Sequence, residues 1–90
     1  MNTYKLFLGT SEDVKKFSNR IIRMESDASI RTEDRKYCVD AKSIMGIFSL
    51  DLTKDLILEI NGDESQFVQD IADMGIYITP FISIGEGKNE

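Results

Sequence analysis

The chain has 90 residues, of which 41% are hydrophobic and 30% charged, and its net charge is −5. This length and this balance are typical of one small folded domain and exclude a disordered chain or two separate cores. The acidic balance disfavours nonspecific binding to nucleic acid or to acidic membranes. No apolar run approaches the ~20 residues that span a bilayer. Residues 1–5 lack the long apolar centre of a signal peptide. The single cysteine cannot form an internal disulfide. We therefore expect a cytoplasmic protein.

The chain opens with a predicted strand and a predicted helix. Residues 3–8 (TYKLFL) are aromatic and aliphatic, and Gly9 ends the run. Thr10, with Asp13 three residues later, approximates a capping box at a helix start. The helix is predicted from apolar residues whose spacing of three or four places them on one face, which Ile22 widens: Val14, Phe17, Ile21 and Met24.

Two short strands should follow as a hairpin. The first covers residues 28–31, the second covers residues 36–40 (KYCVD), and the turn residues 32–35 lie between them. Cys38, in the second strand, is expected to be a small, half-buried residue. A reactive thiol is disfavoured there because no histidine or second cysteine accompanies it.

Ser43 precedes a short apolar run and is therefore a candidate helix N-cap. The run contains Ile44, Met45, Ile47 and Phe48. Gly46 lowers its intrinsic helix propensity by roughly 1 kcal/mol relative to alanine. So short a helix needs a surface to pack on. Either the core of the domain takes its apolar face, or part of that face is free for a partner.

A further strand and a further helix are predicted next. Residues 54–61 (KDLILEIN) alternate as a half-buried strand does, with Ile57 on the outer side, and end at a turn. Glu64 and Ser65 then begin a helix that Gly75 terminates. Its apolar face is formed by Phe67, Val68, Ile71 and Met74.

This order of elements predicts the α+β class. Two amphipathic helices need one shared apolar sheet face, and the other face of the sheet is left to solvent. We assign residues 1–75 to this domain and residues 76–90 to a C-terminal extension with a flexible end. In the extension, Ile76, Ile78, Ile82 and Ile84 alternate with other residues. Pro80 limits the segment to an edge strand or an extended flap that folds back on the domain or mediates self-association.

The segment VDAKSIMGIFSL, from Val39 to Leu50, resembles the region around the regulatory serine of HPr, the histidine-containing phosphocarrier of the bacterial sugar phosphotransferase system. A fainter likeness extends over roughly residues 3–75. The resemblance implies the HPr-like two-layer sandwich, in which a four-stranded antiparallel sheet of order 1-4-2-3 carries its helices on one face.

The sequence departs from this family at the phosphate-accepting histidine, because it contains no histidine. Thr10 stands at the family's histidine position, and Glu12 and Asp13 stand where an arginine and a proline are expected. These carboxylates would repel phosphate, and a threonine without a neighbouring base is a poor nucleophile. We interpret the phosphocarrier role as lost. Serine–histidine and cysteine–histidine catalysis and histidine-containing zinc sites are excluded, so no enzyme, cofactor or metal is expected.

Two functions remain open. The first is a regulatory module similar to the catabolite-repression HPr homologue, for which the resemblance implies phosphorylation of Ser43 by HPr kinase/phosphorylase and binding to a transcriptional regulator of sugar use. Ile44, Met45 and Phe48 would then form the partner-binding surface, so Met45 is expected to be exposed. The second is a divergent structural or oligomerising domain, in which Ser43 is only a cap and the apolar residues are only core.

Overall fold

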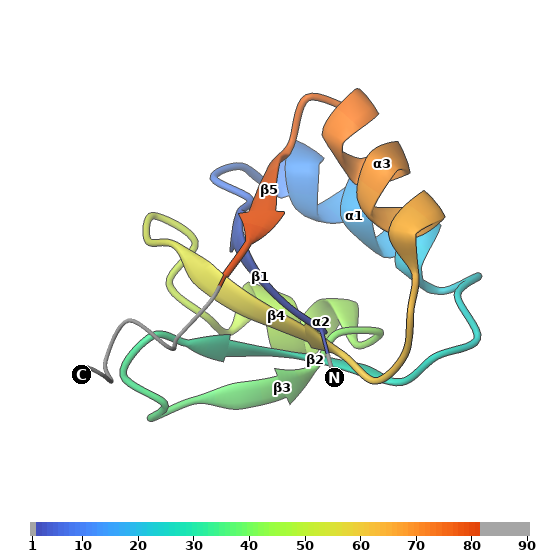
Figure 1. The fold of residues 1–90 in the computed structure, drawn as a ribbon. Coiled ribbons are helices and arrows are strands. Elements are labelled where there is room, and N and C mark those ends of the chain that lie inside the picture. Colours follow the sequence, from blue (N-terminus) through green and yellow to red (C-terminus); the bar gives the residue numbers. More distant parts are fainter. Residues whose placement is uncertain (1, 82–90) are drawn as a thin grey trace.

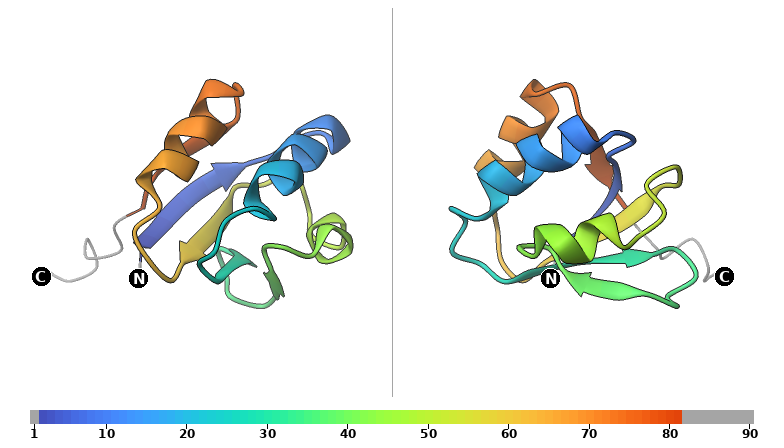
Figure 2. Two further views of the ribbon diagram at one scale, coloured as in Figure 1. Left: turned by 90° about the vertical axis from the view of Figure 1, so that its right-hand side faces the viewer. Right: turned by 180° about the vertical axis from the view of Figure 1, so that it is seen from behind.

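The computed structural model describes residues 2–81. Its elements in chain order are β1 (Asn2–Phe7), α1 (Ser11–Ile21), β2 (Ala28–Thr32), β3 (Cys38–Asp40), α2 (Ile44–Phe48), β4 (Leu56–Ile60), α3 (Ser65–Asp73) and β5 (Tyr77–Pro80). The strands form one sheet of order β3-β2-β4-β1-β5, and every neighbouring pair is antiparallel. The three helices lie over one face of this sheet (Figures 1 and 2). The α+β class and the predicted order 1-4-2-3 of the first four strands are confirmed.

The core lies between the sheet and the helices. Leu6, Leu58 and Ile30 of the sheet meet Phe17 of α1 and Phe67 of α3, and all five are fully buried. The two phenylalanine rings meet edge to face, with centroids 5.8 Å apart, a geometry that aromatic pairs favour. Burial of these side chains supplies the main stabilisation of the fold, at about 25 cal/mol per Å² of apolar surface removed from water.

Helix α1 confirms its predicted start but ends earlier than the apolar spacing indicates. The Thr10 hydroxyl accepts a hydrogen bond from the Asp13 amide at 3.1 Å. The helix ends at Ile21, so Met24 lies in the following loop, although its side chain is buried. Ile22 was expected to widen the apolar stripe, but it is 66% exposed. As the residue after Ile21 it is turned by about 100° from the buried face.

Strand β4 is buried on both faces, contrary to the predicted half-buried strand. Leu56, Leu58 and Ile60 face the helices as expected, but Ile57 on the outer face is also fully buried. Lys5 of β1 and Arg31 of β2 flank Ile57 in the sheet register. The aliphatic stems of such long side chains can cover apolar surface while the charged groups reach water. The outer face is therefore not left wholly to solvent.

The hairpin of β2 and β3 is formed, but Cys38 is exposed rather than half-buried. The reason is its position, because β3 lies at the edge of the sheet and pairs with β2 alone. In the turn, the Asp34 carboxylate accepts hydrogen bonds from the Thr32 hydroxyl at 2.6 Å and from the Lys36 amide at 3.0 Å. Arg35 adopts a positive φ of 65° in the same turn.

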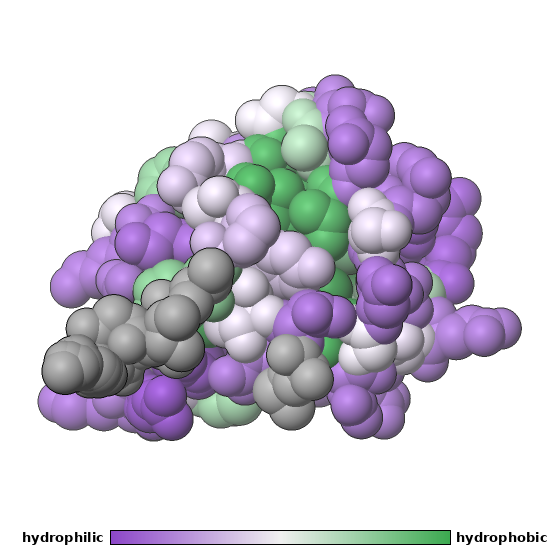
Figure 3. All heavy atoms as spheres, viewed as in Figure 1, coloured by the Kyte–Doolittle hydropathy of each residue, from purple (hydrophilic) through white to green (hydrophobic). Residues whose placement is uncertain are grey.

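The C-terminal segment forms an edge strand up to Pro80. Strand β5 pairs with β1, and the Phe81 amide donates to the Thr3 carbonyl oxygen at 2.9 Å. Ile76 is buried in the core and Ile78 packs against it, so this part folds back on its own domain. Figure 3 shows an apolar strip between β5 and α3 on this side of the molecule. The predicted alternation at Ile82 and Ile84 lies outside the described residues.

Candidate functional site

Ser43 caps helix α2, as predicted. Its hydroxyl oxygen accepts a hydrogen bond from the Gly46 amide at 3.2 Å, and its own backbone is extended. The preceding turn is fixed by Asp40, whose carboxylate accepts from the Lys42 amide at 2.9 Å and whose carbonyl oxygen accepts from the Ser43 amide at 2.9 Å. These bonds hold the Ser43 side chain at an exposed helix start.

Gly46 allows α2 to lie close to the sheet. A Cβ atom at Gly46 would be 3.1 Å from the Val39 Cβ of β3 and 3.2 Å from the Ser43 hydroxyl oxygen. Both distances are tighter than ordinary van der Waals contacts. The low helix propensity of glycine is therefore offset by close packing, a reason that the sequence alone did not provide.

The exposed side of α2 carries three apolar side chains. Met45 is 77% exposed, Phe48 39% and Ile44 37%, whereas Ile47 is fully buried. The exposure predicted for Met45 is confirmed. The domain's own core thus takes Ile47 and leaves the other three residues partly or largely in water. We call Ile44, Met45 and Phe48 the α2 patch.

The basic group nearest to Ser43 in the sequence is already engaged. The Lys42 ammonium donates to the Met24 carbonyl oxygen at 2.6 Å, which ties the loop after α1 to the start of α2. The bond gives the Met24 carbonyl oxygen of this loop a hydrogen-bond donor.

Thr10 has a structural role at the start of α1. Because its hydroxyl accepts from the Asp13 amide, the oxygen is occupied as a helix cap. Glu12 and Asp13 lie in the first turn, where their charge suits the positive end of the helix dipole. Gly9 adopts a positive φ of 71° just before, and a Cβ there would lie 2.7 Å from the Phe7 ring. Thr10 and Ser43 therefore cap two different helices.

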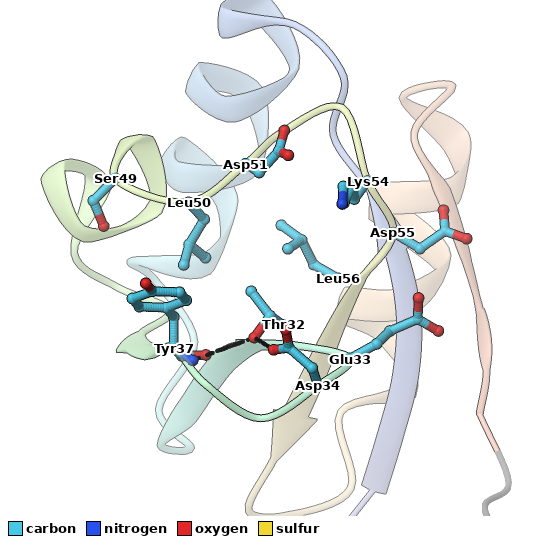
Figure 4. A pocket seen from close by; sticks show the side chains of 10 residues that line it. All are labelled: Thr32, Glu33, Asp34, Tyr37, Ser49, Leu50, Asp51, Lys54, Asp55 and Leu56. Carbon is cyan, nitrogen blue, oxygen red and sulfur yellow. Dashed lines mark hydrogen bonds between the residues drawn. The ribbon is translucent and has the colours of Figure 1, made fainter.

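A surface pocket of about 520 Å³, which the sequence reasoning missed, lies between the β2–β3 turn and the loop from α2 to β4. Figure 4 shows its lining residues around the opening: Thr32, Glu33, Asp34, Tyr37, Ser49, Leu50, Asp51, Lys54, Asp55 and Leu56. In the sequence, the lining residues belong to two separate, mostly polar segments, 32–37 and 49–56. The pairing of β2 with β4 brings these segments together.

Hydrogen bonds favour the charged form of two carboxylates that line this pocket, Asp34 and Asp51. A hydrogen bond from the Thr32 hydroxyl, and then one from the Lys36 amide, lowers the pKa of Asp34. The Thr53 hydroxyl and amide likewise lower the pKa of Asp51. A general acid near neutral pH needs a raised pKa instead. Within residues 2–81, no three or more side chains of histidine, cysteine, aspartate or glutamate are grouped so that they could hold a metal ion.

None of the helices in the described part of the chain is long and apolar enough to cross a membrane. A scan against protein-family models and a search of curated proteins gave no match. Among solved structures, the chain is similar to the crystal structure of HPr-C-His from Thermoanaerobacter tengcongensis. The TM-score is 0.66 and the sequence identity is 22%, over 82% of this chain and 90% of that one. This match agrees with the element order, the sheet topology and the placement of the helices. The chain therefore has an HPr-like fold.

Proposed function

We propose that this protein is a regulatory interaction module on an HPr-like fold that has lost the phosphocarrier activity. In this proposal, HPr kinase/phosphorylase phosphorylates Ser43, and the phosphorylated form binds a transcriptional regulator of sugar use through the α2 patch. The observation that carries the proposal is an exposed serine that caps a short helix, together with a largely exposed methionine in the first turn of that helix.

The two parts of this surface supply different properties. Burial of the Met45 and Phe48 side chains against a partner would supply affinity, and methionine adapts readily to different apolar surfaces. A phosphate on Ser43 would add about two negative charges and several hydrogen-bond acceptors. Because the Lys42 ammonium is held by the Met24 carbonyl oxygen, a basic group of the partner would be the natural counter-charge.

The proposed loss of phosphate transfer follows from the residues at the start of α1. The sequence has no histidine, and Thr10 uses its oxygen as a cap. Glu12 and Asp13 add negative charge where an incoming phosphoryl group would need to approach. The module is therefore proposed to act by binding and not by catalysis.

The test is phosphorylation of the full chain by a purified HPr kinase/phosphorylase with labelled ATP. We expect one phosphate on the wild type and none on Ser43→Ala. Ser49→Ala is the matched control, because Ser49 is an exposed serine at the other end of α2 and should leave labelling unchanged. An unlabelled wild type, or equal labelling of Ser43→Ala, would contradict the proposal.

A binding measurement then tests the surface. The phosphorylated chain should bind the regulator, and Met45→Asp should weaken binding at least tenfold, since about 1.4 kcal/mol corresponds to a factor of ten. Arg23→Ala, which removes a side chain outside the α2 patch, should leave the affinity within about twofold.

The alternative function is a divergent structural or oligomerising domain without phosphorylation. It is favoured by the altered start of α1 and by exposed apolar side chains near one edge of the sheet, including Tyr37 and Met45. An unmodified Ser43 together with a concentration-dependent oligomer would support this alternative over the regulatory one.

A further inference from the structure

Strand β3 presents a free edge of the sheet. It pairs with β2 on one side, and no other strand within residues 2–81 pairs with its opposite side. The Tyr37 carbonyl oxygen accepts from the Thr32 amide at 3.0 Å, and the Ala41 amide donates to the Ala28 carbonyl oxygen at 3.0 Å. Backbone groups alternate in direction along an antiparallel strand. Residues 37, 39 and 41 therefore point toward β2, and the amide and carbonyl groups of Cys38, with the amide of Asp40, point outward.

The opposite edge of the sheet is a poor template for pairing. In β5 the Phe81 amide donates inward to Thr3, so the same alternation turns the backbone of Ile78 and Pro80 outward. Proline has no amide hydrogen and cannot donate to a new strand. Self-association through a sheet edge therefore favours β3.

We propose that β3 is an interface for a second copy of this chain, in which two β3 strands pair antiparallel around a two-fold axis at Cys38. In this register Cys38 lies opposite Cys38 of the partner subunit, and each Cys38 amide donates to the carbonyl oxygen of the other. The outward groups of Cys38 deduced from the β2 register are the ones that the central pair needs, and the Asp40 amide can donate to the Lys36 carbonyl oxygen of the partner subunit. The Lys36 amide and the Asp40 carbonyl oxygen stay bonded to Asp34 and Ser43 of their own chain. The two copies would share one continuous sheet.

The side chains of the segment KYCVD are complementary to themselves in this register. Lys36 lies opposite the partner's Asp40, and Asp40 lies opposite the partner's Lys36, so the charges match twice. Tyr37 lies opposite the partner's Val39, a pairing of an aromatic with a β-branched side chain that stabilises sheets. A lysine on an edge strand normally hinders association, but here Lys36 meets an opposite charge only when the partner is another copy in this register.

The burial pattern around β3 fits such a partner. Tyr37 is 64% exposed, and the partly buried Val39 lies beneath α2 at Gly46. Strand alternation places both on the helix side of the sheet, where the pocket view shows the Tyr37 ring at the rim (Figure 4). A second copy would cover the Tyr37 ring with Val39 of its own β3. The proposal does not depend on phosphorylation of Ser43.

The experiment is sedimentation equilibrium of the full chain under reducing conditions, from micromolar to millimolar concentration. We expect a monomer–dimer equilibrium. Lys36→Glu places like charges opposite each other twice and should weaken the dimer about tenfold or more, given ordinary cross-strand charge effects. Lys16→Glu makes the same charge change on an exposed residue of α1 and should leave the dimer unchanged.

A charge-swap mixture makes the test specific to the register. Asp40→Lys alone should also weaken the dimer, whereas an equimolar mixture of Lys36→Glu and Asp40→Lys restores both opposite-charge pairs and should restore dimerisation. Melting curves confirm that each variant is folded, because Asp40 also accepts from the Lys42 amide. A short bis-maleimide should join two chains through Cys38 in the wild type and in Lys16→Glu, and less in Lys36→Glu.

Three results would overturn the proposal. The first is a wild type that remains monomeric at millimolar concentration. The second is a dimer that Lys36→Glu leaves as strong as before, which would place the contact on another surface. The third is a charge-swap mixture that stays monomeric although both variants are folded.

Discussion

The most informative single substitution is Met45→Asp, compared with Ile47→Asp on the same helix. Met45 is 77% exposed and lies in the first turn of α2, where a carboxylate is favoured by the helix dipole by roughly 0.3–1 kcal/mol. Its free energy of unfolding should therefore stay within about 0.5 kcal/mol of the wild type. Ile47 is fully buried, so the same aspartate there both removes a core side chain and buries a carboxyl group.

The expected loss at Ile47 can be divided into two terms. Removing a buried isoleucine to the size of alanine costs about 2–5 kcal/mol, and burying a polar group without a partner costs about 1–3 kcal/mol more. This total approaches the whole stability of a small domain, about 5–15 kcal/mol. Ile47→Ala provides a variant that remains measurable if Ile47→Asp does not fold.

The assay is equilibrium unfolding in urea, read as the midpoint and the slope of the transition. Met45→Asp should show an unchanged slope and a nearly unchanged midpoint, and both Ile47 variants should show a clear loss of stability. A loss above about 2 kcal/mol for Met45→Asp would show that the core takes this side chain. The α2 patch would then have no surface to offer a partner.

Three further predictions concern other positions. Ser43→Ala should lower the free energy of unfolding by roughly 0.5–2 kcal/mol, whereas Ser43→Asp should be tolerated better because a carboxylate also caps; urea melts compare them. Gly75→Ala should lower the free energy of unfolding by about 1–2 kcal/mol in the same assay, because Gly75 has a positive φ of 86°. A Cβ atom at Gly75 would meet no atom within 4 Å, so the expected loss comes from backbone strain alone. The lowered pKa of Asp51 stabilises the fold fully above its ordinary value of 3.8, and this stabilisation is lost as the pH falls through the lower folded pKa. Melting temperatures from about pH 5 to pH 2 should therefore fall less steeply in Thr53→Ala, and an equal fall would contradict this assignment.

A fifth prediction concerns phosphate transfer. When the chain is incubated with labelled phosphoenolpyruvate and the first enzyme of the phosphotransferase system, it should remain unlabelled because it has no histidine. An acid-labile phosphate adduct on the chain would contradict the proposed loss of the carrier role.

Local chemistry made both helix caps predictable from the sequence. A threonine or serine before an apolar run was enough to place Thr10 and Ser43, and each accepts a hydrogen bond from the third following amide. The positive φ of Gly75 after α3 is a similar local feature. Such features depend on neighbours within a few residues, and for this reason sequence patterns report them well.

The errors arose where neighbours in space decide the outcome. Ile57 was expected on an open face, but it is fully buried, and Lys5 and Arg31 flank it on the adjacent strands. Cys38 was expected to be half-buried, but its strand lies at an edge. The pocket joins two distant polar runs, and no spacing within either run indicates this contact.

The position of β1 in the sheet has a consequence for the synthesis of the chain. Its neighbours are β4 and β5, so residues 2–7 emerge from the ribosome before either pairing partner exists. Between residue 7 and residue 56 lie 49 steps of elongation (56 − 7), or roughly 2–10 s at about 5–20 residues per second. During this interval the apolar segment TYKLFL has no strand to pair with and is open to chaperones or aggregation. The sheet closes only when β4 inserts between β1 and β2, so its formation waits until about two thirds of the chain has been made.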